Sequence, residues 1–181
     1  MKTNKAMGRR QFLRSSTAVA TGLAVCRALP ARAAQAKLST PSMEKLGWQL
    51  SVQLYTYRRY PLFEALDKVA ELGIRHIEPL TALKVDAKRP ELRANEDLPP
   101  DVRKELKTML ADRGMFLSSI FASFTGEPAQ AKRLFDFCQE MGTGTIVAEP
   151  PAGALDMIEK LCDEYRINVA FHNHARGQSP Y

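Results

Sequence analysis

The sequence predicts an α/β fold built around a parallel sheet. Short apolar runs alternate with amphipathic segments from Trp48 to Phe171, the spacing between them is regular, and glycines such as Gly73 and Gly142 follow the amphipathic segments. Parallel neighbours need a crossover between consecutive strands, usually a helix. Right-handed crossovers keep those helices on the outside of the sheet.

The first expected strand spans Trp48–Tyr55, where apolar and polar residues alternate. The first expected helix spans Pro61–Leu72, because Leu62, Leu66 and two later apolar residues form one stripe. Gly73 follows this stripe and is typical of a helix end.

The next two units repeat this pattern. A second strand is expected at His76–Leu80, followed by a long polar connector from residue 81 to 97. Two prolines then precede a helix expected at Asp101–Asp112. The third strand is expected at Met115–Ala122 and the third helix at Glu127–Met141.

The last expected elements are a strand at Thr145–Ala148, a helix at Ala152–Tyr165 and a fifth strand at Ile167–Phe171.

Two architectures fit this order. A doubly wound open sheet accommodates five strands in ~145 residues, whereas an eight-stranded barrel needs about 250 residues and is cut here past its midpoint. The turn after the first strand, 55–60, contains no glycine, which disfavours a dinucleotide site. The glycine pair at 142–144 is interpreted as a helix end.

The first 33 residues are predicted to be a twin-arginine signal peptide, with a linker at 34–45 and the folded domain at 46–181. Arg9–Arg14 resembles the twin-arginine motif, and Ala31–Ala33 is a small-residue cleavage site. The apolar stretch between them is shorter than the roughly 20 residues of a membrane span. We therefore expect a periplasmic or secreted protein with no stable membrane insertion after cleavage.

Charge and cysteine content exclude two classes of protein. The chain has 26 basic and 20 acidic residues, but residues 1–33 hold seven basic residues and no acidic ones. The remaining part is therefore almost neutral, which argues against a nucleic-acid partner. Cys138 and Cys162 lie inside expected helices outside any CxxC pair, so we expect free thiols and no disulfide framework.

Two of the three histidines, His172 and His174, follow the last apolar run. Side chains two residues apart on a strand point to the same face, so these imidazoles can converge on one cation. Structural hydrogen bonding is the alternative. His76 begins a strand and is predicted to be structural.

Three segments resemble the sugar phosphate isomerase/epimerase family, which is built on the xylose-isomerase-like TIM barrel. They are Ser51–Thr56 (SVQLYT), Ile74–Glu78 (IRHIE) and Ile167–His174 (INVAFHNH), and the resemblance covers about residues 46–174. It implies that 46–181 is the N-terminal portion of a (β/α)8 barrel, with about five strands and four helices. It also implies a divalent cation (Mn, Mg, Co or Zn) at the carboxyl ends of the strands, and acid/base groups that move a proton next to a sugar carbonyl.

The resemblance places several polar residues at those strand ends. The candidate acid/base residues are Glu78 and Glu149, the candidate substrate contacts are Tyr55 and Arg58, and the candidate metal ligands are His172 and His174. Each has a structural alternative. A carboxylate within an apolar strand needs a partner, a carboxylate at a helix entrance stabilises the positive helix end, and an arginine pair in a loop can simply be solvated.

The leading hypothesis is an exported isomerase or epimerase acting on a sugar or sugar derivative. The alternatives are a non-catalytic carbohydrate-binding or interaction protein, and a metal-dependent nuclease acting on abasic DNA, which the near-neutral charge disfavours. The family's later ligands are absent from the sequence, so the chain alone is expected to bind metal poorly and to turn over little sugar. We therefore expect either a truncated gene or the assembly of two chains as a homo-oligomer.

Overall fold

The computed structural model of the chain describes residue 38 and residues 40–175. The chain divides into two units, 1–34 and 35–181, and the described residues belong to the second. The predicted signal peptide lies outside the described residues, so export stays a prediction. Within the described part, no helix combines the length and the apolar character that crossing a membrane requires.

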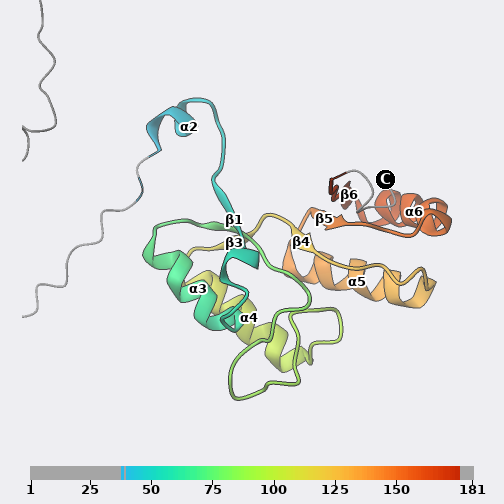
Figure 1. The fold of residues 1–181 in the computed structure, drawn as a ribbon, viewed down its shortest axis with the longest axis horizontal. Coiled ribbons are helices and arrows are strands. Elements are labelled where there is room, and N and C mark those ends of the chain that lie inside the picture. The colour runs from blue at the N-terminus through green and yellow to red at the C-terminus, as the bar shows by residue number, and fades with distance from the viewer. Residues whose placement is uncertain (1–37, 39, 176–181) are drawn as a thin grey trace, which may run out of the picture. The chain divides into compact units, whose positions relative to one another are not determined.

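Strands and helices alternate along the chain (Figure 1). The strands are β1 (Ser51–Gln53), β2 (His76–Glu78), β3 (Phe116–Leu117), β4 (Ile120–Phe121), β5 (Thr145–Ala148) and β6 (Asn168–Phe171). The α-helices are α2 (Pro41–Lys45), α3 (Leu62–Glu71), α4 (Pro100–Asp112), α5 (Pro128–Met141) and α6 (Leu155–Tyr165). Two short 3₁₀ helices, η1 (Leu54–Tyr57) and η2 (Ala152–Ala154), follow β1 and precede α6.

The strands pair in parallel, and their order in space is their order in the sequence. β1, β2 and β3 form one ladder, and β4, β5 and β6 form another. A parallel bridge between Leu80 and Phe121 joins the ladders, and the amide of Thr81 donates to the carbonyl of Phe121 at 2.9 Å. A doubly wound sheet places its first strand inside, with a reversal of direction beside it. The observed order contradicts that alternative and is consistent with part of a TIM-barrel-like fold.

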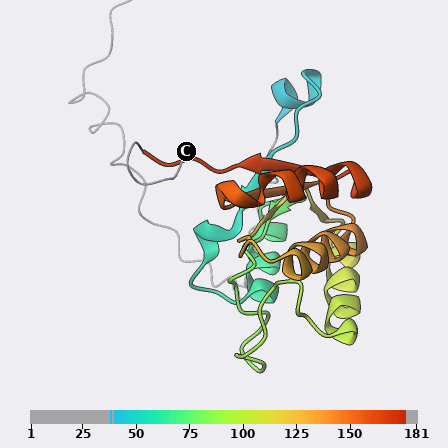
Figure 2. The same ribbon diagram turned by 90° about the vertical axis from the view of Figure 1, so that its right-hand side faces the viewer.

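Alternate strand residues face opposite sides of the sheet. Ile77 and Ile146 are fully buried on the side that packs against the helices, and Figure 1 shows α3, α4 and α5 along one side of the strands. α5 packs against α6, as Figure 2 also shows. His76, Glu78 and Thr145 lie on the opposite face and are only partly buried. This face therefore carries the polar side chains available for a site.

The third strand contains one extra residue. Phe116 pairs with His76 in the first ladder, whereas Phe121 bridges Leu80, so the register moves by one residue between the two pairs. The insertion splits the predicted strand Met115–Ala122 into β3 and β4. Insertions of this kind bend a strand and redirect its side chains, and they are frequent next to active sites.

Several other predicted boundaries differ from the structure. The first strand begins at Ser51, because Trp48 and Leu50 are exposed and pair with no neighbouring strand in the described residues. Its predicted end is instead the 3₁₀ helix η1. The predicted linker contains the short helix α2, which begins at a proline. The glycine pair is confirmed as a helix end, because Gly142 adopts a left-handed conformation (φ 73°) after α5.

Both described cysteines are free thiols, as predicted. Burial raises the pKa of Cys138 to about 12, and it raises the pKa of the less buried Cys162. Because the thiolate is the reactive form, the thiolate fraction of Cys138 at pH 8 is roughly a thousandfold below that of an ordinary thiol. We expect iodoacetamide to leave Cys138 unmodified in the folded chain and to alkylate it in urea. Peptide mass spectrometry measures both, and fast labelling of the folded chain at Cys138 would contradict the assignment.

Candidate functional site

Three candidate residues lie at the carboxyl ends of β5 and β6. Ala148 pairs with Phe171 at the end of the ladder, and the amide of His172 donates to the carbonyl of Ala148 at 2.9 Å. This register brings Glu149, the residue after β5, beside the residues that follow β6. The site thus forms because two adjacent parallel strands end together.

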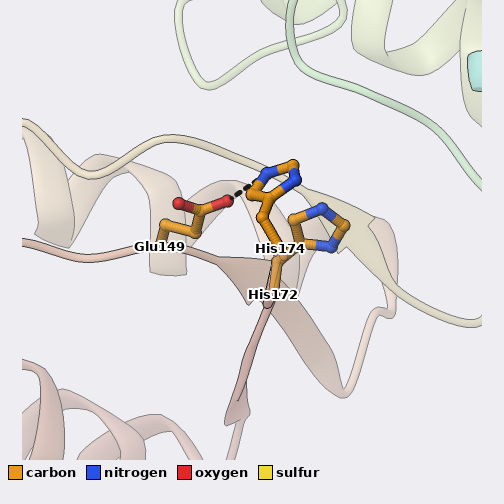
Figure 3. A group of neighbouring side chains, drawn as sticks. All are labelled: Glu149, His172 and His174. Atoms are coloured by element: carbon orange, nitrogen blue, oxygen red, sulfur yellow. Dashed lines mark ion pairs between the residues drawn. The ribbon is translucent and has the colours of Figure 1, made fainter. Parts of the chain in front are cut away.

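Glu149, His172 and His174 form a compact cluster (Figure 3). Nε2 of His174 lies 2.7 Å from Oε1 of Glu149. The ring centroids of His172 and His174 are 4.7 Å apart, with their planes at 83°. One ligand atom from each residue can be chosen so that all lie within 4.8 Å of one another. We call these three residues the Glu-His-His cluster.

The Glu-His-His cluster fits a divalent cation. With bonds of about 2.1 Å, ligand atoms on one ion lie no more than about 4.2 Å apart, so small side-chain rotations bring these atoms to coordinating distance. Two imidazoles and a carboxylate match zinc and the transition metals better than magnesium, which prefers oxygen ligands and ideal octahedral geometry. Three protein ligands leave further coordination positions open for water or substrate.

The surroundings of the cluster are apolar on one side and open on another. The ring of Phe121 meets His172 edge-on at a centroid distance of 4.9 Å. The side chain of Glu149 is 23% exposed and that of His174 is 44% exposed. A ligand can therefore reach His174 from solvent, while Phe121 restricts how the His172 ring can turn.

A second polar cluster surrounds Glu78 on the same face of the sheet. Nε2 of Gln53 donates to Oε1 of Glu78 at 2.5 Å, and Oγ of Ser119 donates to Oε2. Gln53 is the register partner of Glu78 on β1, and Ser119 belongs to the segment where β3 gives way to β4. Glu78 is thus held by donors from both neighbouring strands.

Tyr55 and Arg58, the predicted substrate contacts, touch each other. The guanidinium carbon of Arg58 lies 4.3 Å from the centroid of the Tyr55 ring, and its Nη1 donates to the Tyr55 carbonyl at 3.0 Å. Both residues lie in or just after η1, and Tyr55 is 53% exposed. They remain accessible to a ligand, but the contact between them fixes the Arg58 side chain.

His76 lies at the amino end of β2, away from the strand ends that carry the two clusters. Its Nδ1 is 3.1 Å from Oγ of Ser118, and its ring stacks on Phe116 at a centroid distance of 5.4 Å. These contacts agree with the structural role predicted for this histidine.

The structure regroups the residues that sequence analysis proposed. Glu149, predicted as an acid/base group, lies with His172 and His174, whereas Glu78 lies in the separate cluster. Sequence analysis did not single out Gln53 or Ser119. The only sequence signals for them are a polar residue at the end of the SVQ strand and a serine pair that interrupts an apolar run.

No protein family model and no curated protein matches the chain. Two solved structures from Parabacteroides distasonis are similar to it. One, described only as an uncharacterized protein, is 31% identical with a TM-score of 0.64, over 70% of this chain and 53% of that protein. The other, a sugar phosphate isomerase/epimerase, is 18% identical with a TM-score of 0.52, over 74% of this chain and 56% of that protein. The chain spans about half the length of both proteins, and the second likeness shows a shared fold.

Proposed function

We propose that the chain belongs to a sugar isomerase or epimerase that moves a proton next to a sugar carbonyl with the help of a divalent cation. The observation that supports this most strongly is the meeting of Glu149, His172 and His174 where β5 and β6 end. Active sites of barrel enzymes lie at that edge of the sheet. The fold shared with a sugar phosphate isomerase/epimerase favours the same class of reaction.

The residues of the two clusters have different roles in this proposal. Glu149, His172 and His174 would hold the cation, which supplies a positive charge for the oxygen on which negative charge develops. Glu78 acts as the base: it takes the proton from the carbon beside the carbonyl and, in an isomerisation, returns it to the neighbouring carbon on the same face, while the hydroxyl proton moves to the former carbonyl oxygen. An epimerisation would need a second proton donor on the opposite face of the sugar. Gln53 and Ser119 hold both oxygens of Glu78, so its carboxylate is oriented before the substrate arrives.

The test is exchange of substrate hydrogen with D₂O by the full chain in the presence of Mn²⁺. A panel of aldoses, ketoses and their phosphates is incubated, and deuterium next to the carbonyl is measured by NMR. We expect slow exchange that EDTA abolishes and that Glu78→Gln lowers by about a hundredfold or more, the usual contribution of a positioned base. The matched control is Glu64→Gln, the same change at an exposed residue of α3 whose carboxylate lies 3.4 Å from the ammonium of Lys68.

Metal binding by Glu78→Gln separates the two roles. Its Mn²⁺ affinity should equal that of the unsubstituted chain, because Glu78 is not in the Glu-His-His cluster. If no sugar of the panel exchanges hydrogen while sugars still bind in EDTA, the non-catalytic carbohydrate-binding alternative replaces the proposal.

A further inference from the structure

A cavity of about 440 Å³ opens where the segment after β1 faces the loop after β2. Four of the side chains that line it are cationic, and none is acidic. The cationic ones are Arg58, Arg59, Lys84 and Arg93. The volume is within the range of about 300–1,000 Å³ typical of small-molecule sites. We call this space the basic cavity.

Two of its arginines are already oriented by the backbone. Arg58 donates to the Tyr55 carbonyl at 3.0 Å, and Arg93 donates to the Pro90 carbonyl at 2.6 Å. A guanidinium has five N–H donors in a planar fork, so each arginine keeps donors for a ligand. Such forks match the oxygens of phosphate and carboxylate groups in pairs.

The walls of the basic cavity are fastened together by backbone hydrogen bonds. Leu62 donates to the carbonyl of Lys84 at 2.8 Å, which ties the start of α3 to the loop. Within the loop, Lys84 and Arg93 form an antiparallel bridge, and Ala94 donates to Leu83 at 2.9 Å. A site whose backbone is ordered in advance loses less entropy when it binds a ligand. The cationic residues therefore project from a defined scaffold.

Asp86, an acidic residue of the same loop, does not cancel this charge. Asp86 is absent from the cavity lining, and its carboxylate accepts hydrogen bonds from the amide of Lys88 and from the guanidinium and amide of Arg89. These bonds, chiefly the one with the Arg89 side chain, lower the pKa of Asp86. Arg89 in turn pairs with Glu105 at 2.9 Å. Asp86 and Glu105 are both paired with Arg89, and no acidic side chain lines the cavity.

We propose that the basic cavity binds the anionic group of a small ligand, namely the phosphate or carboxylate of a sugar derivative. The arginine forks, the excess of positive charge and the volume all fit a single charged group with a small body attached. Both walls follow strands at their carboxyl ends, the edge that also carries Glu149, His172 and His174. Only the sugar part of this assignment rests on the proposed function; the anion site depends on the cavity alone.

The test is calorimetric titration of the full chain at low ionic strength with inorganic phosphate, glucose 6-phosphate, glucuronate and glucose. We expect glucose 6-phosphate or glucuronate to bind and glucose not to bind, and the preferred anion identifies the group. Arg59→Gln and Lys84→Gln should each weaken binding of the preferred probe by about tenfold, the loss expected for one charged hydrogen bond. Lys107→Gln, an equal charge change on the exposed face of α4, should leave it unchanged.

Several outcomes would overturn the anion site. The first is binding of glucose as tight as that of glucose 6-phosphate. The second is that Lys107→Gln weakens binding of the preferred anion as much as the cavity variants do. The third is that neither Arg59→Gln nor Lys84→Gln weakens it. EDTA distinguishes this site from the metal cluster, because anion binding that disappears with the cation places the anion on the metal instead. Anion binding that persists in EDTA supports the cavity even if the hydrogen exchange test fails. Circular dichroism verifies that each variant is folded, and Arg59, which is exposed, decides the result if Lys84→Gln unfolds.

Discussion

Replacing His172 and His174 together with alanine is expected to abolish measurable binding of Zn²⁺ or Mn²⁺. The double variant keeps only Glu149 of the Glu-His-His cluster, and one carboxylate does not hold a transition metal against water. Loss of a residue that only hydrogen-bonds to a metal ligand typically lowers metal affinity by about 10- to 100-fold. Loss of two direct ligands should therefore lower it further. Calorimetric titration, with a competing chelator for the tighter metal, measures the change.

His76→Ala is the control for this experiment. It removes the remaining histidine of the chain, which lies at the amino end of β2, and with it the hydrogen bond between His76 and Ser118. Its metal affinity should match that of the unsubstituted chain. Equal binding by the double variant and the unsubstituted chain would place the metal elsewhere. Weak binding by all three proteins would instead agree with the expectation that this chain alone holds metal poorly.

Replacing Phe135 with alanine is expected to lower the free energy of unfolding by about 3–5 kcal/mol, the usual cost of such a cavity. Phe135 is fully buried on α5. Its ring centroid lies 6.3 Å from that of Phe124 and 5.4 Å from that of Tyr165, so the truncation removes contacts with α6 and with the segment before α5. Urea denaturation followed by circular dichroism measures the change.

Phe116→Ala is the matched control, because the same ring is 56% exposed on β3. Phe116→Ala should lower the free energy of unfolding by well under half as much as Phe135→Ala, because most of the surface of the Phe116 ring already contacts water. Similar losses for the two variants would show that α5 does not form the centre of the core.

Local sequence patterns predicted α3, α4, α5 and α6 well, because each of these four helices buries an apolar stripe. The short helix α2 has no buried residue and was expected to be part of a linker. The helix expected at Glu127–Met141 is α5 to within one residue. The strand expected at Thr145–Ala148 is β5 with identical bounds, because its alternation of buried and half-buried residues is uninterrupted. The strand order, which separates a barrel from an open sheet, depends on long-range pairing and could not be read from these patterns.

The sites were harder to predict, because they combine residues from different strands. The pair of histidines was visible from their spacing, but the contact of His174 with Glu149 depends on β5 and β6 ending in register. The hydrogen bond from Ser119 to Glu78 lies where one extra residue shifts the third strand, and an apolar run gives no sign of such an insertion. The basic cavity could not be predicted either, because it depends on the folded conformation of the connector at residues 81–97, whose polar sequence predicted only a loop.

The roles proposed for the site depend on the binding of one divalent cation by Glu149, His172 and His174. Anomalous diffraction from crystals of the chain grown with Zn²⁺ tests it most directly. We expect one strong peak at about 2.0–2.2 Å from a carboxylate oxygen of Glu149 and from one ring nitrogen of each of the two histidines His172 and His174. A zinc peak bound by other residues, with the contact between Glu149 and His174 still in place, would contradict it.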